Sequence, residues 1–188
     1  MHFQIRFSQG RRLLTTACGL ALTLSHTLAF AATIAFPING GQLPPLSLPK
    51  SIPVPIEAPY GQVVAQATFE PGMSTDGGSC VVSQTTGVNG EPVLGSRNTY
   101  KTNVPGIGVR FYITGDWNNT WEQAPTISQF QLGPASATEH YTRADLVVIG
   151  PVSRGTLTDL PSMTVTLSGT CITPVVRTQY IKPGTLIR

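Results

Sequence analysis

The stretch that decides the fold is YKTNVPGIGVRFYIT, residues 100–114. From Ile107 onward the apolar residues fall at every second position, at 107, 109, 111 and 113. Successive side chains of a strand point to opposite faces, so this alternation predicts a half-buried antiparallel strand with four apolar side chains on one face. Two glycines interrupt the start of the strand, and Pro105 biases the residue before it toward extended backbone geometry.

The rest of the chain reads as short strands between turn residues. Glycine and proline are spread throughout, and no long stretch has an apolar period of 3.6 residues. Turn sequences such as Asn89-Gly90 and Gly150-Pro151 separate the candidates. Short strands at this spacing predict an all-β antiparallel sandwich or barrel, with residues 40–50 as an extended crossing. The predicted strands are residues 52–56, 62–69, 79–84, 107–114, 126–132, 145–149, 162–168 and 175–181.

Residues 1–31 have the pattern of a secretory signal peptide. Three arginines form a basic start, residues 13–28 supply a mostly apolar segment, and Ala29-Phe30-Ala31 is a small-x-small cleavage site. The competing interpretation is a transmembrane helix, but the apolar run is short and no second run follows. We therefore expect an exported protein whose mature part, residues 32–188, forms one domain.

Removal of the signal peptide changes the charge of the chain. All nine acidic residues follow residue 31, whereas three of the twelve basic residues precede it, so the mature formal charge is zero. The basic pI of the whole chain therefore belongs to the export signal. No cluster of lysine and arginine remains to indicate binding to nucleic acid or anionic lipid.

Two cysteines remain in the mature chain, Cys80 and Cys171. In an oxidising compartment they could form a disulfide that closes a long loop, which would stabilise the fold by about 4–5 kcal/mol in the chain-entropy model. Cys171 has the same parity as Met163, Val165 and Leu167, so on a regular strand it would point inward.

Three segments together resemble one protein family. The sequence TNVPGIGVRFY at 102–112 closely resembles a signature in the N-terminal receptor-binding domain of chaperone–usher fimbrial tip adhesins. Residues 46–61 look like the early strand and turn of these domains, and residues 144–157 are similar to their later strand, Gly-Pro and Gly-Thr-Leu element. The segments occur in the family's order and span most of the mature chain.

The resemblance implies an immunoglobulin-like or jelly-roll lectin sandwich at the tip of a pilus. Such domains bind a host glycan or an extracellular-matrix protein without catalysis and without a cofactor. They reach the cell surface through the periplasm with a chaperone and an outer-membrane usher, and they assemble with other fimbrial subunits. In full-length members a pilin domain follows, which accepts a donor strand from the next subunit. We expect no complete pilin domain in this chain.

The resemblance also leaves the disulfide open. Related adhesins often carry a cysteine soon after the mature start, and this would be the natural partner of Cys80, but residues 33–38 contain none. Cys171 would then belong with a cysteine in a following domain. The sequence alone does not decide between the pair Cys80–Cys171 and this alternative.

The sequence contains little that could support catalysis or bind a metal ion. His140 is the single histidine of the mature chain, and no Gly-x-Ser-x-Gly nucleophile motif is present. Two cysteines and one histidine make no zinc spacing. A carboxylate pair for glycoside hydrolysis would have to use residues such as Glu139 and Asp145, which lie in no recognisable context. We therefore expect no enzyme and no bound metal.

The best candidate for ligand binding is the loop GDWNNTWE, residues 115–122. Sugars require flat apolar rings for stacking and carboxylate or amide groups for their hydroxyls, and this loop supplies both. The alternative is a hairpin tip whose tryptophans pack back onto the sandwich. The expected contacts are Asp116, Trp117, Asn118, Asn119 and Thr120, with Trp121 in the core.

A second and weaker candidate for ligand binding is the polar segment 139–143, in which Tyr141 is the aromatic residue. A structural pilin that donates an N-terminal strand is the alternative function. Ile34, Phe36 and Ile38 alternate as a donor strand would, although Pro37 would remove a ladder hydrogen bond. A secreted hydrolase is the third and least supported function.

Overall fold

The computed structural model describes residues 34–35, 43–70, 73–75, 80–114, 120–132, 137–138, 141–169 and 172–188. The predicted signal peptide lies outside these residues, so its assignment stays a prediction. Cys171 also lies outside them, and the Cys80–Cys171 pair therefore stays a prediction that the intact mass before and after reduction tests.

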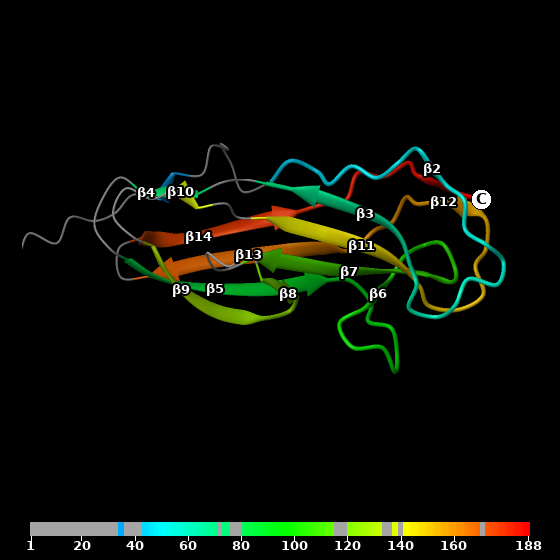
Figure 1. Ribbon diagram of the computed structural model, residues 1–188, viewed down its shortest axis with the longest axis horizontal. Helices are drawn as coiled ribbons and strands as arrows, with labels where there is room; N and C mark the ends of the chain where they lie inside the picture. The colour runs from blue at the N-terminus through cyan, green and yellow to red at the C-terminus, as the bar shows by residue number, and fades with distance from the viewer. Residues whose placement is uncertain are drawn as a thin grey trace, which may run out of the picture.

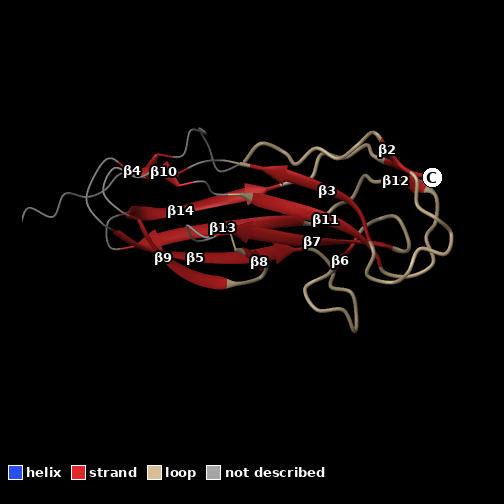
Figure 2. Cartoon of the chain, in the orientation of Figure 1, coloured by secondary structure: helices blue, strands red, loops and turns tan. Residues whose placement is uncertain are grey.

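The described residues form strands and loops and no helix (Figure 2). None of them therefore forms a helix long and apolar enough to span a membrane. The strands are β1 (Ile34–Ala35), β2 (Ser51–Ile52), β3 (Val63–Phe69), β4 (Met73–Thr75), β5 (Cys80–Asn89), β6 (Tyr100–Lys101), β7 (Ile107–Thr114), β8 (Trp121–Gln123), β9 (Ile127–Leu132), β10 (Ala137–Thr138), β11 (Thr142–Val148), β12 (Gly155–Thr156), β13 (Ser162–Gly169), β14 (Ile172–Gln179) and β15 (Leu186–Ile187).

Two larger antiparallel sheets form the sandwich. One has the order β3-β11-β7-β6 with β8 also paired to β7, and the other has the order β14-β13-β5-β9. Their inner faces share one hydrophobic core, in which Phe111 of β7, Leu146 of β11 and Leu167 of β13 are almost completely buried. The predicted all-β antiparallel sandwich is therefore confirmed.

Two three-stranded sheets complete the fold at opposite ends of its long axis (Figure 1). The sheet β1-β4-β10 lies at one end, and the sheet β12-β15-β2 lies beside the C-terminus at the other. In the second sheet β2 and β15 run parallel, which differs from the expected antiparallel pattern. Parallel pairing arises because the segment after residue 43 and the end of the chain run side by side in the same direction.

The N-terminal segment is held against the end of β14. The backbone amides of Leu43 and Leu46 donate to the carbonyl oxygens of Thr178 and Tyr180 at 2.9 and 2.7 Å. In the interior, Gln179 donates to the Pro44 carbonyl oxygen and accepts from the Thr142 hydroxyl. The predicted extended crossing is thus confirmed for residues 43–50, and buried polar groups tie it to both sheets.

The alternating strand in the deciding stretch is confirmed as β7, at the expected residues 107–114. Its apolar positions 107, 109, 111 and 113 are completely buried in the sandwich. Other boundaries differ from expectation. The predicted strand 52–56 shrinks to Ser51–Ile52, and the predicted strand 79–84 lengthens to Asn89.

Pairing with β13 is the reason that β5 continues past residue 84. The second half of β5 contains threonines and a glycine and shows no apolar alternation, but its ladder with β13 continues without a break from Val82 to Asn89. Similarly, β14 begins at Ile172 instead of residue 175 because its first residue pairs with Gly169 of β13. Pairing with β13 therefore extends β5 and β14 beyond the residues whose apolar pattern predicted a strand.

Candidate functional site

Sequence reasoning placed ligand contacts in two segments, residues 115–122 and 139–143. Asp116, Trp117, Asn118 and Asn119 lie outside the described residues, so the structure does not test them. Thr120 is described and exposed, directly before β8.

Tyr141 is described and half-buried, directly before β11. Its ring lies 6.2 Å from that of Trp121 between centroids, at an interplanar angle of 52°. The two predicted segments therefore meet at the side chains of Trp121 and Tyr141.

Trp121 does not lie in the core, contrary to expectation. Its side chain is half-buried and lies over the guanidinium group of Arg143, whose Cζ is 4.6 Å from the ring centroid. The same Cζ lies 4.3 Å from the ring centroid of Tyr112. Residue 121 has the strand parity of the outer face, opposite Thr114, so the sheet turns its indole away from the core. Arg143 thus makes cation–π contacts with two aromatic rings.

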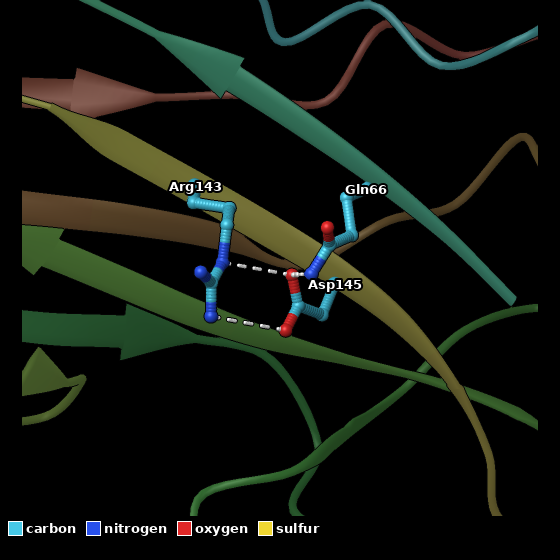
Figure 3. A network of polar contacts seen from close by, with 3 residues as sticks. All are labelled: Gln66, Arg143 and Asp145. Carbon is cyan, nitrogen blue, oxygen red and sulfur yellow. Dashed lines mark hydrogen bonds and ion pairs between the residues drawn. The ribbon is translucent and has the colours of Figure 1, made fainter. Parts of the chain in front are cut away.

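A buried carboxylate holds the other side of Arg143 (Figure 3). Nε of Arg143 lies 3.0 Å from Oδ1 of Asp145, and Nη2 donates a hydrogen bond to Oδ2 at 3.3 Å. Nε2 of Gln66 donates to Oδ1 at 3.1 Å. The Asp145 side chain is only 4% exposed, so the carboxylate acts as a fixed anchor for the guanidinium group.

Burial raises the pKa of the Asp145 carboxyl above its ordinary value. The positive charge of Arg143, the hydrogen bonds from Gln66 and Arg143, and the charge of Arg110 lower this pKa but do not cancel the effect of burial. Removal of a carboxylate from water disfavours its ionised form, and this cost here exceeds the local attraction.

Strand register brings these residues together. Asp145 of β11 faces Gln66 on β3 and Arg110 on β7, so one row crosses three strands. Two residues earlier on β11, Arg143 faces Tyr112 in the next row. On β7 and β11 these polar positions alternate with buried residues, so they lie on the outer face of the sheet. We call Tyr112, Trp121, Tyr141, Arg143 and Asp145 the aromatic–arginine face.

The loop before β6 is fastened to the same sheet. Nε of Arg110 donates to Oγ1 of Thr99 at 2.9 Å, and Ser96 donates to the same hydroxyl oxygen. Nε2 of Gln123 on β8 donates to the carbonyl oxygen of Asn98 at 3.1 Å. Both contacts use outer-face side chains, so the sheet fixes the position of this loop.

The signature residues themselves have structural roles. The Asn103 side chain donates to the Thr156 carbonyl oxygen at 2.8 Å and accepts the backbone N–H groups of Thr158 and Asp159. Gly106 has a φ of +84°, and a Cβ there would lie 2.2 Å from the carbonyl oxygen of Pro151. The turn at 102–108 therefore clamps the later Gly-Pro segment and the loop before β13.

The aromatic–arginine face offers recognition chemistry. Its groups are two rings around a cation and one buried anion, with no nucleophile paired to a base. In the part of the chain that the structure describes, no three histidine, cysteine or acidic residues gather as metal ligands. The sequence had pointed to Tyr141 and the 139–143 segment, but it gave no reason to select Tyr112 or Gln66, because only register places them beside Arg143.

Comparisons with known proteins agree with this architecture. The crystal structure of the receptor-binding domain of the plasmid-born adhesin MrkD1P of Klebsiella pneumoniae matches with a TM-score of 0.53 at 16% identity, covering 84% of this chain and 95% of that one. The CupB6 tip adhesin from Pseudomonas aeruginosa matches with a TM-score of 0.52 at 10% identity, covering 72% of this chain and 50% of that one. A search of curated proteins found no match.

The family of MrkD-like receptor-binding domains matches residues 51–158, which is more than half of the chain and includes the signature turn, β7 and β11. This match decides between the two functions expected from the sequence, in favour of the adhesin over the structural pilin. The chain therefore belongs to the family of MrkD-like receptor-binding domains, and it is a receptor-binding domain of the fimbrial adhesin type.

Proposed function

We propose that this domain attaches a bacterium to a host surface by binding a host glycan or an extracellular-matrix protein, and that it contacts this ligand through the aromatic–arginine face. Binding is non-covalent and needs no cofactor. Asp116, Trp117, Asn118 and Asn119 directly precede Thr120 and Trp121 in the sequence, so we include these residues in the proposed contact surface.

The observation that supports this surface is the restrained position of Arg143. Two rings and a buried carboxylate hold its guanidinium group before any ligand arrives. A side chain that is already ordered loses little conformational entropy on binding, so more of its contact energy contributes to affinity. Arginine and large aromatic residues are also the types that contribute most at protein interfaces.

The same groups suit either class of ligand. Aromatic faces stack on the apolar faces of sugar rings and on aliphatic side chains of proteins. A guanidinium group carries five N–H donors, and Asp145 engages only two of its nitrogens, so donors remain for hydroxyl, carbonyl or carboxylate oxygens. Weak individual contacts would gain strength from many fimbriae on one cell.

The proposal includes the assembly route that the family suggests. The chain would pass through the periplasm, bind a chaperone and an outer-membrane usher, and join other fimbrial subunits at the pilus tip. A complete receptor-binding sandwich needs no donor strand from outside. We therefore expect mature protein made without a chaperone to be monomeric and to unfold cooperatively, whereas a structural pilin would need a donor peptide.

Replacement of Trp121 by alanine tests the contact surface. Mature wild-type protein and the Trp121→Ala variant are measured against immobilised collagens, fibronectin and laminin and against a glycan array. We expect the variant to lose at least tenfold in affinity for the ligand that the wild type binds, about 1.4 kcal/mol. Tyr60→Ala is the matched control, because Tyr60 is an exposed aromatic residue outside this face.

Unchanged affinity of the Trp121→Ala variant would remove the aromatic–arginine face from the proposal. Equal losses in both variants would indicate a general effect of aromatic truncation. If the folded wild type bound none of the glycans or matrix proteins, the proposed ligand classes would be wrong.

A further inference from the structure

Two adjoining cavities form a groove away from the aromatic–arginine face. One has a volume of about 600 Å³ and lies between the N-terminal segment, the loop before β13 and residues 180–183. The other has a volume of about 380 Å³ and lies between residues 89–91, 101–103 and 159–162. Both volumes fall within the roughly 300–1,000 Å³ of small-molecule sites. Asp159, Leu160 and Tyr180 line both cavities, and we call the joint depression the Tyr180 groove.

The walls of the Tyr180 groove are held by the backbone and by the signature turn. The side-chain amide of Asn103 donates to the carbonyl oxygen of Thr156 at the end of β12 and accepts the backbone N–H groups of Thr158 and Asp159. In the wall of the second cavity, a Cβ on Gly90 would lie 2.7 Å from Cβ of Pro161, so only glycine allows this close approach. The groove is therefore preformed, as expected of a site that binds a small ligand.

Several polar groups in the groove are not engaged by the protein. Within the described residues, the carboxylate of Asp159, the ammonium group of Lys182 and the hydroxyl group of Tyr180 make no hydrogen bond or ion pair. The Tyr180 residue is 40% exposed, although its backbone is paired with the N-terminal segment. An aromatic residue beside an unpaired acceptor and an unpaired donor is a suitable arrangement for a polyhydroxylated ligand.

The remaining charges of the groove balance one another. Glu91 and Lys101 form an exposed ion pair in the smaller cavity, Lys182 lines the larger cavity, and Asp159 lines both. Two acidic and two basic side chains leave the lining without net charge. A ligand with a strong charge of either sign would therefore meet attraction and repulsion together.

We propose that the Tyr180 groove binds a neutral oligosaccharide of at least two sugar units. One sugar ring lies in each cavity, and Tyr180 between them contacts both. Asp159 accepts hydrogen bonds from sugar hydroxyl groups, and Lys182 and the Tyr180 hydroxyl donate to their oxygens. The proposal rests on the receptor-binding role for its source of ligand, but it shares no residue with the aromatic–arginine face.

The test is a titration of isotope-labelled mature protein with mannotriose, chitotriose and lacto-N-tetraose, followed by amide chemical shifts in NMR. We expect at least one of these sugars to shift the amides of residues 158–162 and 180–183. The shifts should disappear in Tyr180→Ala. In Asp159→Asn, which keeps the size of the side chain, the affinity obtained from the titration should fall at least fivefold. They should persist in Trp121→Ala and in Tyr60→Ala, which serve as controls for the other face and for aromatic truncation.

Three outcomes would overturn the proposal. The first is shifts confined to the amides around Tyr112 and Arg143 and lost in Trp121→Ala, which would support the aromatic–arginine face alone. The second is no shift with any neutral sugar. The proposed function would survive that outcome if the protein still bound a matrix protein in the binding experiment described above. The third is groove shifts with sialyllactose but none with the neutral sugars, which would show that the ligand is charged.

Discussion

The signature turn at 102–108 leads into β7, and the aromatic–arginine face takes Tyr112 from the same strand, yet different physical demands determine the residues of the two regions. In the turn, Gly106 and Gly108 are required because neighbouring backbone and side chains leave no room for a Cβ. On the face, Tyr112 is placed by its cross-strand neighbour Arg143, and any residue of strand propensity would have preserved the ladder. The turn therefore carries the sequence pattern of the family, whereas the face can change its chemistry without changing the fold.

The same contrast appears in two ion pairs. Beside the turn, Lys101 and Glu91 form a pair whose side chains are 45% and 70% exposed. On the face, Arg143 and Asp145 form a pair whose side chains are 20% and 4% exposed. Water screens the first pair and solvates either partner alone, whereas a lone partner of the second would remain partly desolvated. The difference in burial therefore predicts unequal losses of stability when each pair is broken by mutation.

The largest effect is expected for Gly106→Ala in the turn. The substitution combines left-handed backbone strain with a Cβ that meets backbone atoms of residues 151 and 152 closer than 3 Å, so we expect a loss of about 3–5 kcal/mol in the free energy of unfolding. Gly61→Ala is the matched control, because Gly61 has a φ of +83° but open space around its Cβ position. Urea unfolding should show a loss of only about 1–2 kcal/mol there. Equal losses would mean that backbone strain alone explains the glycine of the signature.

The second effect is expected for Asp145→Leu on the face. Loss of the carboxylate leaves the guanidinium group of Arg143 and the amide of Gln66 without their acceptor, at a cost of about 2–3 kcal/mol in unfolding free energy. The control is Glu91→Leu, which breaks the exposed pair and should change stability by less than about 1 kcal/mol. Chemical denaturation of both variants gives the comparison, and similar losses would contradict the assigned difference between the pairs.

A smaller effect is expected for Asn103→Ala, which releases the clamp on the loop before β13. Three hydrogen bonds of about 0.5–1.5 kcal/mol each are lost, but water replaces part of them at this exposed site, so we expect a loss of about 2 kcal/mol. Asn103→Asp keeps the acceptor for two backbone N–H groups and should lose less. The measurement is hydrogen exchange at the amides of Thr158 and Asp159, which should become faster in Asn103→Ala. Unaltered exchange in that variant would show that the loop does not depend on the clamp.

The smallest effect is a pH dependence that belongs to the face. Because the pKa of Asp145 is raised in the folded protein, its contribution to stability is complete below its ordinary pKa of 3.8 and is lost as the pH rises through the folded pKa. Between pH 3 and pH 6 the unfolding free energy of the wild type should therefore fall relative to that of Asp145→Asn, whose side chain does not titrate. A difference that moved in the opposite direction would mean that the attraction of Arg143 exceeds the cost of burial.

Local sequence was sufficient for much of the fold because its signals are short-range. The alternation at 107–113 predicted β7 with correct boundaries, since burial of one strand face requires that period. It could not predict β8, which has three residues and exists because Trp121–Gln123 pair with the end of β7. Nor could it predict the full length of β5, whose second half is a strand only through its ladder with β13.

The binding surfaces were less accessible to sequence reasoning than the fold. Aromatic and polar composition selected residues 115–122 and Tyr141, and the structure brings Trp121 of the first segment to Tyr141. The sequence did not predict the outward direction of Trp121 or its contact with Arg143. Both depend on which face each strand turns to the core, and a shift of one residue in register would reverse them.

By itself the sequence determined an all-β domain, its principal strand and its family, because strand alternation and turn residues are patterns that act within a few positions of the chain. The tertiary structure alone decided that Gln66, Tyr112, Arg143 and Asp145 form one cluster, and that residues as distant as 45, 103 and 180 line one groove. The reason is physical. Cross-strand register and sheet packing depend on the whole chain at once, so no local pattern specifies which outer-face side chains become neighbours.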